Sequence, residues 1–407
     1  MKKAVLSCII LFGSIPCHGR IITVDNDGPA DFNTIQAAIN DANDGDSVLV
    51  MPGLYQEAIS FSGKDITVTS AEPTNWSCVS TTVIYYDDHP SPGGPAVLFK
   101  GTEQSSCMLA GFTIYGYIQG KDWQSYPVDD ANTHATITYC KIQNCYGDCG
   151  TVISRCDGLI SNCLITDNNH VFCVCICHTI EECKGVIRNC TIANNRHSGI
   201  WFGDGGPVLE NCIIVEYLSW NAELPAPKIS FTNIYSPHQQ YDANFLASLG
   251  PGNISVDPCF VPSQEIGVGS CHLRSAGWRW SQPGGYWTWD DVTSRCIDAG
   301  NPASPLGAEP MTVPRDPNSI YGTNVRIDMG VYGGTAQASI PPHQWTLLAD
   351  ITNDRKVDFN DLAFLAIDWQ SGDEEHPGDF DRNSIVNLND FALFVEDWLE
   401  ETIWQEN

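Results

Sequence analysis

Two acidic segments near the C-terminus carry oxygen-bearing side chains at matching spacing. Asp350 begins the first segment and Asp379 begins the second, an offset of 379 − 350 = 29 residues. Calcium is a hard cation that takes six to eight oxygens, and an EF-hand loop supplies them from positions 1, 3, 5, 7, 9 and 12. The spacing therefore predicts two calcium-binding loops. Their proposed ligands are Asp350, Thr352, Asp354, the Lys356 carbonyl, Asp358 and Asp361 in the first loop, and Asp379, Asp381, Asn383, the Ile385 carbonyl, Asn387 and Asp390 in the second.

Each proposed loop leads into a segment whose apolar residues recur at helical spacing, which predicts an amphipathic helix. Without calcium the clustered carboxylates would repel one another, so calcium binding should be coupled to folding. The alternative is an acidic, solvated tail, which predicts neither regular spacing nor buried aromatic residues. The apolar stripes consist of Val357, Leu362, Leu365 and Trp369, and of Val386, Phe391, Phe394 and Trp398.

Two such loops in tandem, each with aspartate at position 12 and each followed by one helix, resemble a type I dockerin. The resemblance implies a small α-helical domain over residues 345–407 and a cohesin-type protein partner. Thr352 is a weak calcium ligand, so the first site is expected to be the weaker one. Two further departures concern position 6, usually glycine, and positions 10 and 11, which in dockerins often carry recognition hydroxyls. These positions hold Arg355 and Ser384, and Phe359-Asn360 and Leu388-Asn389.

A group of histidines and acids in the middle of the chain offers side chains for acid–base catalysis. His170 and His197 are 197 − 170 = 27 residues apart, and Asp204 follows. Histidine and carboxylate together suit general acid–base chemistry. The alternative is a solvated ladder of turn residues without a catalytic role. The whole group is Asp148, Asp167, His170, Arg196, His197 and Asp204.

Aromatic residues are dense around Pro283-Gly284-Gly285. Exposed aromatic rings stack on sugar faces, so these side chains are a candidate carbohydrate-binding site. The alternative is a hairpin whose aromatic side chains cover one end of the fold. The candidates for sugar binding are Trp278, Trp280, Trp287 and Trp289, with Tyr286 beside them.

A repeat of variable length indicates the elements that position these residues. Its unit is an aliphatic residue, two variable residues, a small or apolar residue, one variable residue and isoleucine. The fourth position, from Phe112 to Thr232, advances by 28, 23, 27, 22 and 20 residues. Helical repeats keep constant lengths, so this drift indicates coils of short strands joined by variable turns. The units are Leu109–Ile114, Ile137–Ile142, Ile160–Ile165, Ile187–Ile192, Leu209–Ile214 and Ile229–Ile234.

Side chains alternate along a strand, so positions four and six of the unit should share the inner face and form ladders in a continuous core. A second interior ladder is predicted at Val152, Cys175 and Phe202. Asparagine and aspartate tolerate left-handed backbone, so a recurring turn is predicted two residues past the ladder isoleucine. The turn residues are Asn144, Asp167 and Asn194.

Cysteine occupies the fourth position in four successive units. The leading interpretation is that these thiols are buried and act as small apolar side chains. Disulfides between coils are one alternative, because neighbouring strands lie about 4.8 Å apart. A soft-metal site is another, at Cys173, Cys175, Cys177 and His178. The four ladder cysteines are Cys140, Cys163, Cys190 and Cys212.

The start of the coil is expected to be capped, because an open end exposes the core and an unpaired strand edge. Residues 31–42 predict an amphipathic helix, with Asn33 and Gln36 at its N-terminal cap. Phe32–Ile39, followed by Gly45-Asp46-Ser47-Val48 and Pro52-Gly53-Leu54-Tyr55, resembles the opening of pectin-lyase-like right-handed parallel β-helix proteins. This group includes pectate lyases, pectin methylesterases and polygalacturonases.

The resemblance implies an all-β, right-handed parallel β-helix with a capping helix, and covers roughly residues 21–339. Cys296–Asn301 and Asp328–Gly334 are similar to the closing segment of bacterial surface β-helices. The resemblance says little about activity, because one fold carries many functions. The sequence contains neither the Gly-Thr-Val-Asp-Phe-like strand and Gln-Asp pair of pectin methylesterases nor the three-aspartate signature of polygalacturonases.

The N-terminus reads as a secretory signal, with two lysines, a short apolar run and a small residue near position 19. The predicted segments are a signal peptide at 1–19, a β-helix at 20–340 and the calcium module at 345–407. The formal charge of −29 argues against nucleic acid as a partner. It also weighs against a strongly polyanionic substrate, unless the fold gathers a local basic patch.

These features together predict a secreted β-helix protein, extracellular or at the cell surface, that interacts with polysaccharide. One hypothesis is a polysaccharide lyase or glycoside hydrolase tethered through its calcium-binding tail. The other is a non-catalytic surface or adhesion protein that binds glycans with the same coil.

Overall fold

The computed structural model describes residues 19–86, 94–121, 132–145, 151–168, 178–195, 199–203, 205–220, 223, 225–262, 271–282, 284–311, 322–372 and 375–402. The predicted signal peptide lies almost wholly outside these residues. Among the described residues, no helix is both long and apolar enough to cross a membrane.

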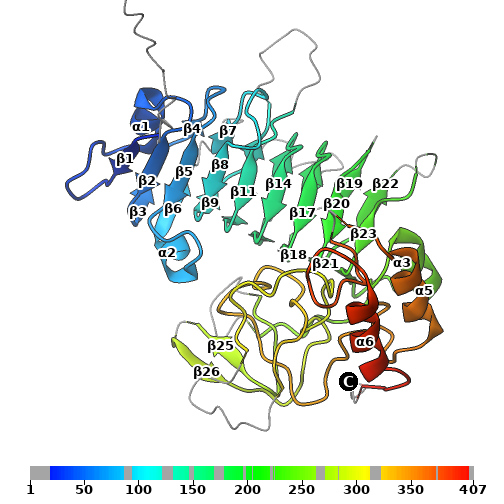
Figure 1. The fold of residues 1–407 in the computed structure, drawn as a ribbon. Coiled ribbons are helices and arrows are strands. Elements are labelled where there is room, and N and C mark those ends of the chain that lie inside the picture. The colour runs from blue at the N-terminus through cyan, green and yellow to red at the C-terminus, as the bar shows by residue number, and fades with distance from the viewer. Residues whose placement is uncertain are drawn as a thin grey trace, which may run out of the picture.

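Between Ile21 and Ile234, the described residues wind into a coil of short strands that form three parallel sheets (Figure 1). In most of the coil, each turn contributes one strand to each sheet. Each strand pairs with the equivalent strands of the adjacent turns. Sheet A has nine strands: β1 Ile21–Val24, β2 Ser47–Val50, β5 Thr67–Ser70, β8 Met108–Ala110, β11 Thr136–Thr138, β14 Leu159–Ser161, β17 Val186–Arg188, β20 Val208–Glu210 and β23 Ile229–Ser230.

The other two sheets complete the circumference of the coil. Sheet B contains β3 Gly53–Tyr55, β6 Thr82–Tyr85, β9 Thr113–Tyr115, β12 Lys141–Gln143, β15 Leu164–Thr166, β18 Thr191–Ala193, β21 Ile213–Val215 and β24 Asn233–Ile234. Sheet C contains β4 Ile59–Ser60, β7 Val97–Leu98, β10 Ile118–Gln119, β13 Ile153–Ser154, β16 Ile180–Glu181, β19 Ile200–Phe202 and β22 Leu218–Trp220.

The register of the predicted repeat is confirmed. Leu109 pairs with Ile137 in sheet A, and Ile114 pairs with Ile142 in sheet B, and later units continue both ladders. The unit is not one strand, however, but two short strands joined by a bend. Its third residue adopts left-handed backbone and turns the chain from sheet A into sheet B. These residues are Gly111 (φ 81°), Tyr139 (52°), Asn162 (48°), Asn189 (51°), Asn211 (54°) and Phe231 (46°).

The predicted turn is confirmed, and the predicted second ladder is wrong. Asn144, Asp167 and Asn194 all have left-handed backbone, with φ of 51°, 57° and 59°. In sheet C, Ile153 pairs with Ile180, and Ile180 pairs with Ile200, so Val152 and Phe202 are not equivalent positions. A step of 23 residues was wrong there because β13 and β16 pair with an offset of 27 residues, Ile153 with Ile180; Cys175 itself lies outside the described residues.

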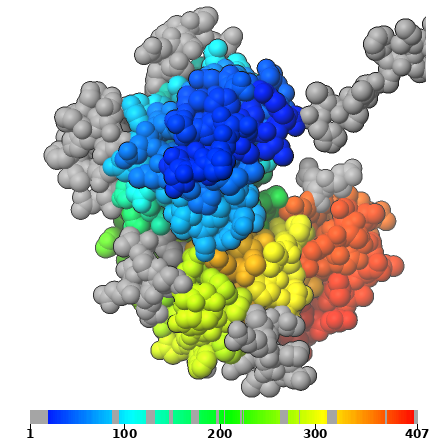
Figure 2. Space-filling view, turned by 90° about the vertical axis from the view of Figure 1, so that its left-hand side faces the viewer, coloured from blue at the N-terminus to red at the C-terminus, as the bar shows by residue number. Residues whose placement is uncertain are grey.

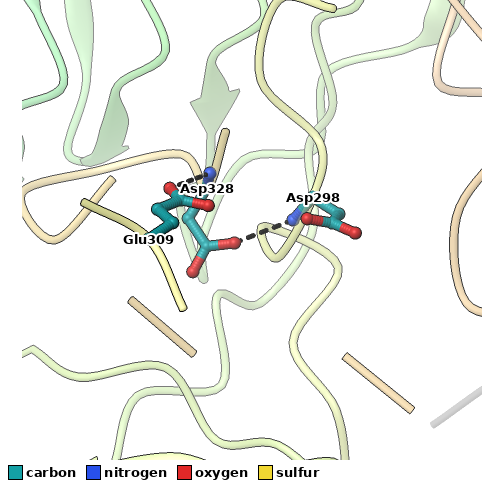
Figure 3. Close-up of side chains that lie close together, drawn as sticks. All are labelled: Asp298, Glu309 and Asp328. Carbon is teal, nitrogen blue, oxygen red and sulfur yellow. Dashed lines mark hydrogen bonds between the residues drawn. The ribbon is translucent and has the colours of Figure 1, made fainter. Parts of the chain in front are cut away.

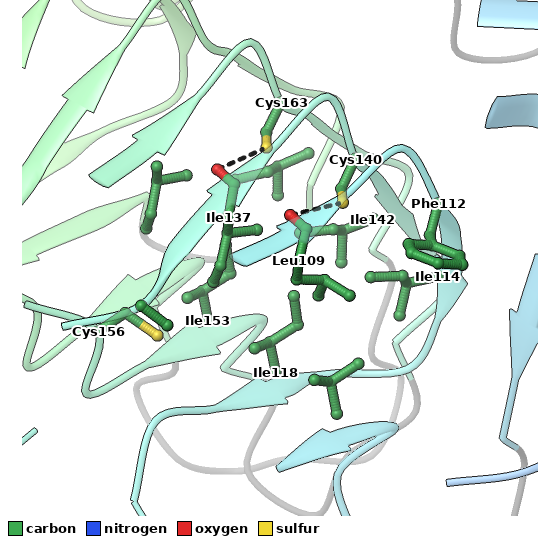
Figure 4. Close-up of a cluster of buried hydrophobic side chains, with 14 of the residues drawn as sticks. Leu109, Phe112, Ile114, Ile118, Ile137, Cys140, Ile142, Ile153, Cys156 and Cys163 are labelled. Carbon is green, nitrogen blue, oxygen red and sulfur yellow. Dashed lines mark hydrogen bonds between the residues drawn. The ribbon is translucent and has the colours of Figure 1, made fainter. Parts of the chain in front are cut away.

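The cysteines of the bend point into the core (Figure 4). Cys140, Cys163, Cys190 and Cys212 are fully buried, and all four are free thiols. Each ladder thiol lies near main-chain carbonyls, as where Cys163 Sγ lies 3.3 Å from the Ser161 oxygen. This confirms the interpretation of cysteine as a small core residue over the described part of the coil. The proposed soft-metal site lies outside it, except for His178.

Helix α1 (Ile35–Asp41) covers the N-terminal end of the coil, shorter than predicted. Its N-cap residue is Thr34, whose side chain makes no capping bond, so the proposed Asn33–Gln36 cap is wrong. Instead, the Glu57 carboxylate accepts hydrogen bonds from the backbone N–H of Ile35 (2.8 Å) and Gln36 (2.9 Å). A distant acid therefore satisfies the free N–H groups of the helix start.

The remaining elements follow or flank the coil. They are α2 (Trp76–Thr81), α3 (Ala243–Leu249), an antiparallel hairpin of β25 (Arg279–Ser281) and β26 (Tyr286–Thr288), and the tail helices α5 (Phe359–Ile367) and α6 (Leu388–Glu396). Between coil and tail, the described residues of 251–340 are mostly irregular, and this stretch is called the closing segment.

The tail packs directly on this closing segment rather than standing apart from it (Figures 1 and 2). One buried cluster joins Phe231 of the coil, Ile297 and Met329 of the closing segment, and Val357 and Phe394 of the tail. Buried polar contacts reinforce the junction. The Arg326 guanidinium donates to the carbonyls of Ala299, Gly300 and Asp350, and the Asn353 amide donates to those of Gly252 and Ala299.

Candidate functional site

A cleft of about 490 Å³ opens on the outside of the coil, where sheet C turns toward sheet A. Among the described residues that line it, four side chains are charged, and three of these are positive: Lys121, Arg155 and Lys184 against Glu182. The chain as a whole carries a formal charge of −29. A local excess of positive charge on such an acidic protein is the basic patch that the overall composition did not reveal. The cleft is lined by Lys121, Asn132, Arg155, Glu182, Cys183, Lys184, Trp201, Gly203 and Gly206.

The register of sheet C brings these residues together. Ile118 pairs with Ile153 and Ile153 with Ile180, so the residues just past β10, β13 and β16 are stacked on successive turns. Lys121, Arg155 and Lys184 follow these three strands within four residues of their ends. Arg155 has left-handed backbone, with φ of 58°, and so does Glu182 at the equivalent place on the next turn, with φ of 53°.

Hydrogen bonds hold the rim of this cleft in place. The Asn132 amide donates to Asp157 Oδ1 (3.0 Å) and to the Glu182 carbonyl (2.9 Å). Asp157 Oδ1 also accepts the backbone N–H of Lys184 at 2.8 Å, which fixes the main chain that carries the lysine. The Arg155 guanidinium forms an ion pair with Glu182. A ligand carboxylate would compete with Glu182 for this guanidinium.

One wall of the cleft is aromatic. Trp201 of β19 is partly exposed, and its ring stacks on the His178 imidazole with centroids 5.2 Å apart and 29° between the planes. His178 is buried, and burial lowers the pKa of its imidazole, so it is neutral near pH 7. Trp201 therefore has a fixed orientation, with one ring edge or face available to the cleft, which suits contact with a sugar ring.

Most of the proposed acid–base group lies outside the described residues. His170, His197 and Asp204 lie there, so their proposed catalytic role stays a prediction. Asp167 is described and serves as a turn residue with left-handed backbone.

The predicted tryptophan site forms a hairpin in the closing segment, well separated from β19 in Figure 1. Trp280 and Trp287 are cross-strand neighbours whose rings meet edge to face at 5.7 Å. Trp278 and Trp289 form a second such pair at 5.2 Å, and of the four only Trp289 is largely exposed, at 63%. These ring pairs give the four tryptophans a structural role in the hairpin. Sugar binding by them stays a prediction.

The two acidic loops of the tail have the same internal hydrogen bonds, which confirms that they are in register. In each, the carboxylate at position 1 accepts the backbone N–H groups of positions 5 and 6. The carboxylate at position 12 accepts those of positions 3 and 9. Positions 4 and 6 have left-handed backbone although none of them is glycine. They are Asn353 (φ 56°), Arg355 (86°), Arg382 (56°) and Ser384 (69°).

The donor set of these loops fits a hard divalent cation. In the second loop, carboxylate oxygens of Asp379, Asp381 and Asp390 lie within 4.8 Å of one another. In the first loop, Thr352 stands in place of the second acid, and its hydroxyl donates to Asp361 Oδ1 at 3.1 Å. The first loop lacks the acid at position 3, but it carries Asp354 and Asp358 at positions 5 and 9, where the second loop has Asn383 and Asn387.

The apolar stripes of the tail are confirmed in part. Val357, Leu365, Val386 and Phe394 are buried, and Leu362 and Trp398 pack against them. Trp369 and Phe391 were wrongly assigned to the core: they are 39% and 40% exposed.

A family model supports the architecture seen in the coordinates. Residues 62–217 match the model described as right handed beta helix region. The three parallel sheets and this match together show a right-handed parallel β-helix. No curated protein matches the chain.

Several solved structures are similar to parts of the chain. Pectate lyase Pel9A is 14% identical over 77% of this chain and 96% of that one, with a TM-score of 0.32. A pectin methylesterase solved with a hexasaccharide is 12% identical over 57% and 77%, with a TM-score of 0.24. The pectin methylesterase from carrot is 12% identical over 58% and 82%, with a TM-score of 0.25. TM-scores this low carry no argument about function.

Proposed function

We propose that this protein binds an acidic polysaccharide in the cleft formed by Lys121, Arg155 and Lys184. The carrying observation is that three cations from successive turns converge beside a partly exposed tryptophan. A glycan with one carboxylate per sugar would meet successive cations as it runs along the coil axis. Charged hydrogen bonds to the carboxylates and contact of a sugar ring with Trp201 would then act together.

Binding is tested with polygalacturonate and, as the neutral counterpart, galactan, by titration calorimetry at low salt. Lys184→Gln and Arg155→Gln are each expected to weaken polygalacturonate binding by roughly fivefold to thirtyfold, on the order of 1–2 kcal/mol for one charged contact. Lys228→Gln is the matched control, because Lys228 is an exposed lysine outside the cleft. Equal affinity for both glycans, or equal loss in all three variants, would contradict the proposal.

The same cleft supports a lyase more readily than a hydrolase. Lyase chemistry on a uronate needs its carboxylate neutralised and a base near the α-proton, and Lys and Arg supply the first requirement. Among the described liners, Glu182 is the only carboxylate, and it is paired with Arg155. Inverting hydrolysis needs two carboxyl groups several ångströms apart. Release of unsaturated ends from polygalacturonate would establish turnover; binding without product would establish the non-catalytic alternative.

The tail is proposed to bind two calcium ions, and the protein to be exported. Support for calcium comes from the twin loops and their shared hydrogen-bond pattern. Bound calcium would neutralise the carboxylates that the loops hold close together. Asp381→Ala removes one exposed ligand of the second loop. It is expected to remove about one bound ion per chain in equilibrium dialysis, whereas loss of no ion would refute that site.

A protein partner on the tail, of the cohesin type, is the remaining proposal for this module. Its support is a pair of equivalent, exposed apolar residues at loop position 10, Phe359 and Leu388, which are 74% and 71% exposed. Phe359→Asp with Leu388→Asp should abolish capture by an immobilised type I cohesin in calcium. Lack of capture by the unaltered protein would remove this proposal and leave calcium binding untouched.

A further inference from the structure

Three carboxyl groups meet inside the closing segment, outside both the cleft and the tail loops (Figure 3). Asp298, Glu309 and Asp328 are 1%, 5% and 1% exposed. One oxygen from each lies within 4.8 Å of the other two. Three buried acids at this separation are costly when charged, because burial removes water and each repels the others.

Backbone N–H groups supply the hydrogen bonds of all three carboxyls. The Val325 N–H donates to Asp298 Oδ2 (3.2 Å). The N–H groups of Asp328 and Gly334 both donate to Glu309 Oε1 (2.9 and 2.8 Å). Asp328 Oδ1 and Oδ2 accept the N–H groups of Asp298 (2.9 Å) and Ser339 (3.0 Å). Donors of this kind stabilise the charged form of a carboxyl and fix its orientation.

Two carboxylate oxygens of this group have no hydrogen-bond donor among the described residues. Asp298 Oδ1 and Glu309 Oε2 are buried and accept no hydrogen bond from any described residue. In Figure 3 the Glu309 oxygen without a drawn bond is turned to the side where Asp328 and Asp298 lie. A buried, unpaired carboxylate oxygen is costly, and its usual partner is a hydrogen-bond donor or a metal ion.

Neighbouring cations do not fill this role. The charges of Arg326 and Arg382 act on Asp298, but their hydrogen bonds go elsewhere. Arg326 donates to the carbonyls of Ala299, Gly300 and Asp350, and Arg382 donates to those of Pro302 and Val325. None of the three carboxyls forms an ion pair with a described side chain. Burial raises the pKa of Asp298 to about 7, and burial and mutual repulsion raise the pKa of Glu309 and Asp328 well above the usual range.

We propose that Asp298, Glu309 and Asp328 form a third calcium site, which holds the closing segment together beneath the tail. Carboxylate oxygens suit calcium, and its ligand distances of about 2.3–2.6 Å place two ligands of one ion at most about 5 Å apart. The three oxygens meet that limit. The site joins three stretches of the closing segment that are 309 − 298 = 11 and 328 − 309 = 19 residues apart. The adjacent Ala299 carbonyl accepts a hydrogen bond from the Asn353 amide of the tail. It does not rest on the proposed glycan binding.

The test is the number of calcium ions per chain, measured by native mass spectrometry and by equilibrium dialysis on the full chain. Asp354→Ala with Asp381→Ala removes one exposed ligand from each tail loop. This double variant is expected to retain one ion, and adding Glu309→Gln is expected to remove it. Glu309→Gln alone should lower the count of the unaltered protein by one. Asp291→Asn, at a side chain that is 83% exposed, is the control and should change nothing.

A double loop variant that binds no calcium would overturn the third site, whatever the loops do. So would an unchanged count in folded Glu309→Gln protein. If Glu309→Gln does not fold, the double loop variant still decides the question, because it keeps all three acids of the site. A count that falls by one in Glu309→Gln while the loop variants lose nothing would uphold the third site and refute the tail loops.

Discussion

Glu216 provides a test of how the coil buries polar groups. It continues a ladder of amides inside the turn after sheet B: the Asn168 amide donates to Asn195 Oδ1, and the Asn195 amide donates to Glu216 Oε1. Its other oxygen accepts the Thr179 hydroxyl at 2.8 Å. Burial raises the pKa of Glu216 to about 8, and these hydrogen bonds only partly oppose the effect. The folded protein therefore holds a neutral Glu216 at pH 7.

The sign of the effect follows from proton counts. Between the ordinary value of 4.5 and the folded value of about 8, the folded state binds more protons than the unfolded state. Stability therefore falls as pH rises through that window and levels off above it. Between pH 6 and pH 9, titration of this one group lowers the free energy of unfolding by about 2–3 kcal/mol, because each unit of pKa difference corresponds to about 1.4 kcal/mol.

Glu216→Gln removes the titration and preserves the shape of the side chain. Its amide can donate to Thr179 while its carbonyl accepts from Asn195. Urea unfolding from pH 6 to pH 9, in constant calcium, should show the unaltered protein losing about 2–3 kcal/mol more than the variant. Glu396→Gln, at an exposed glutamate of α6, should follow the unaltered protein. Parallel pH profiles for unaltered protein and Glu216→Gln would refute a neutral, buried Glu216.

Three further outcomes are expected. Arg326→Met leaves buried carbonyls of the closing segment and tail without a donor, and should lower the free energy of unfolding by about 3 kcal/mol in urea titrations; a loss below about 1 kcal/mol would contradict that role. Reducing agent should leave the melting temperature unchanged, because the ladder cysteines Cys140, Cys163, Cys190 and Cys212 are free thiols; a drop would indicate disulfides. A chelator should lower the melting temperature in calorimetry and keep one transition, because coil end and tail share a core; no shift would argue against bound calcium.

The ladders of the coil could be predicted from the sequence because each interior position repeats the same chemistry. Cys163 and Cys190 could be assigned to the core from the isoleucine two residues later, and the pairing of Ile165 with Ile192 bears this out. The bend inside the unit was missed because a single left-handed residue, such as Asn162, leaves the apolar pattern unchanged. The local apolar pattern therefore predicts which residues pair between turns, but it does not predict where the chain bends from sheet A into sheet B.

The basic cleft could not be predicted, because its residues share no repeat position. Lys121, Arg155 and Lys184 are separated by 34 and 29 residues, and only the lengths of the turns bring them together. The third acidic site was hidden for a similar reason. Asp298 and Asp328 were noted only as parts of a closing motif, and Glu309 lies in neither stretch of that motif. Sequence spacing does reveal the tail loops, because all their ligands lie within twelve consecutive residues.

The most direct test of the central claim is a crystal structure of the protein with a bound acidic oligosaccharide, such as tetragalacturonate. The account predicts that the saccharide lies along the coil axis, with its carboxylates within hydrogen-bond distance of Lys121, Arg155 or Lys184 and one sugar ring against Trp201. The Arg155–Glu182 ion pair should open to admit a carboxylate. A saccharide bound on the tryptophan hairpin, with the cleft empty at saturating ligand, would contradict the account.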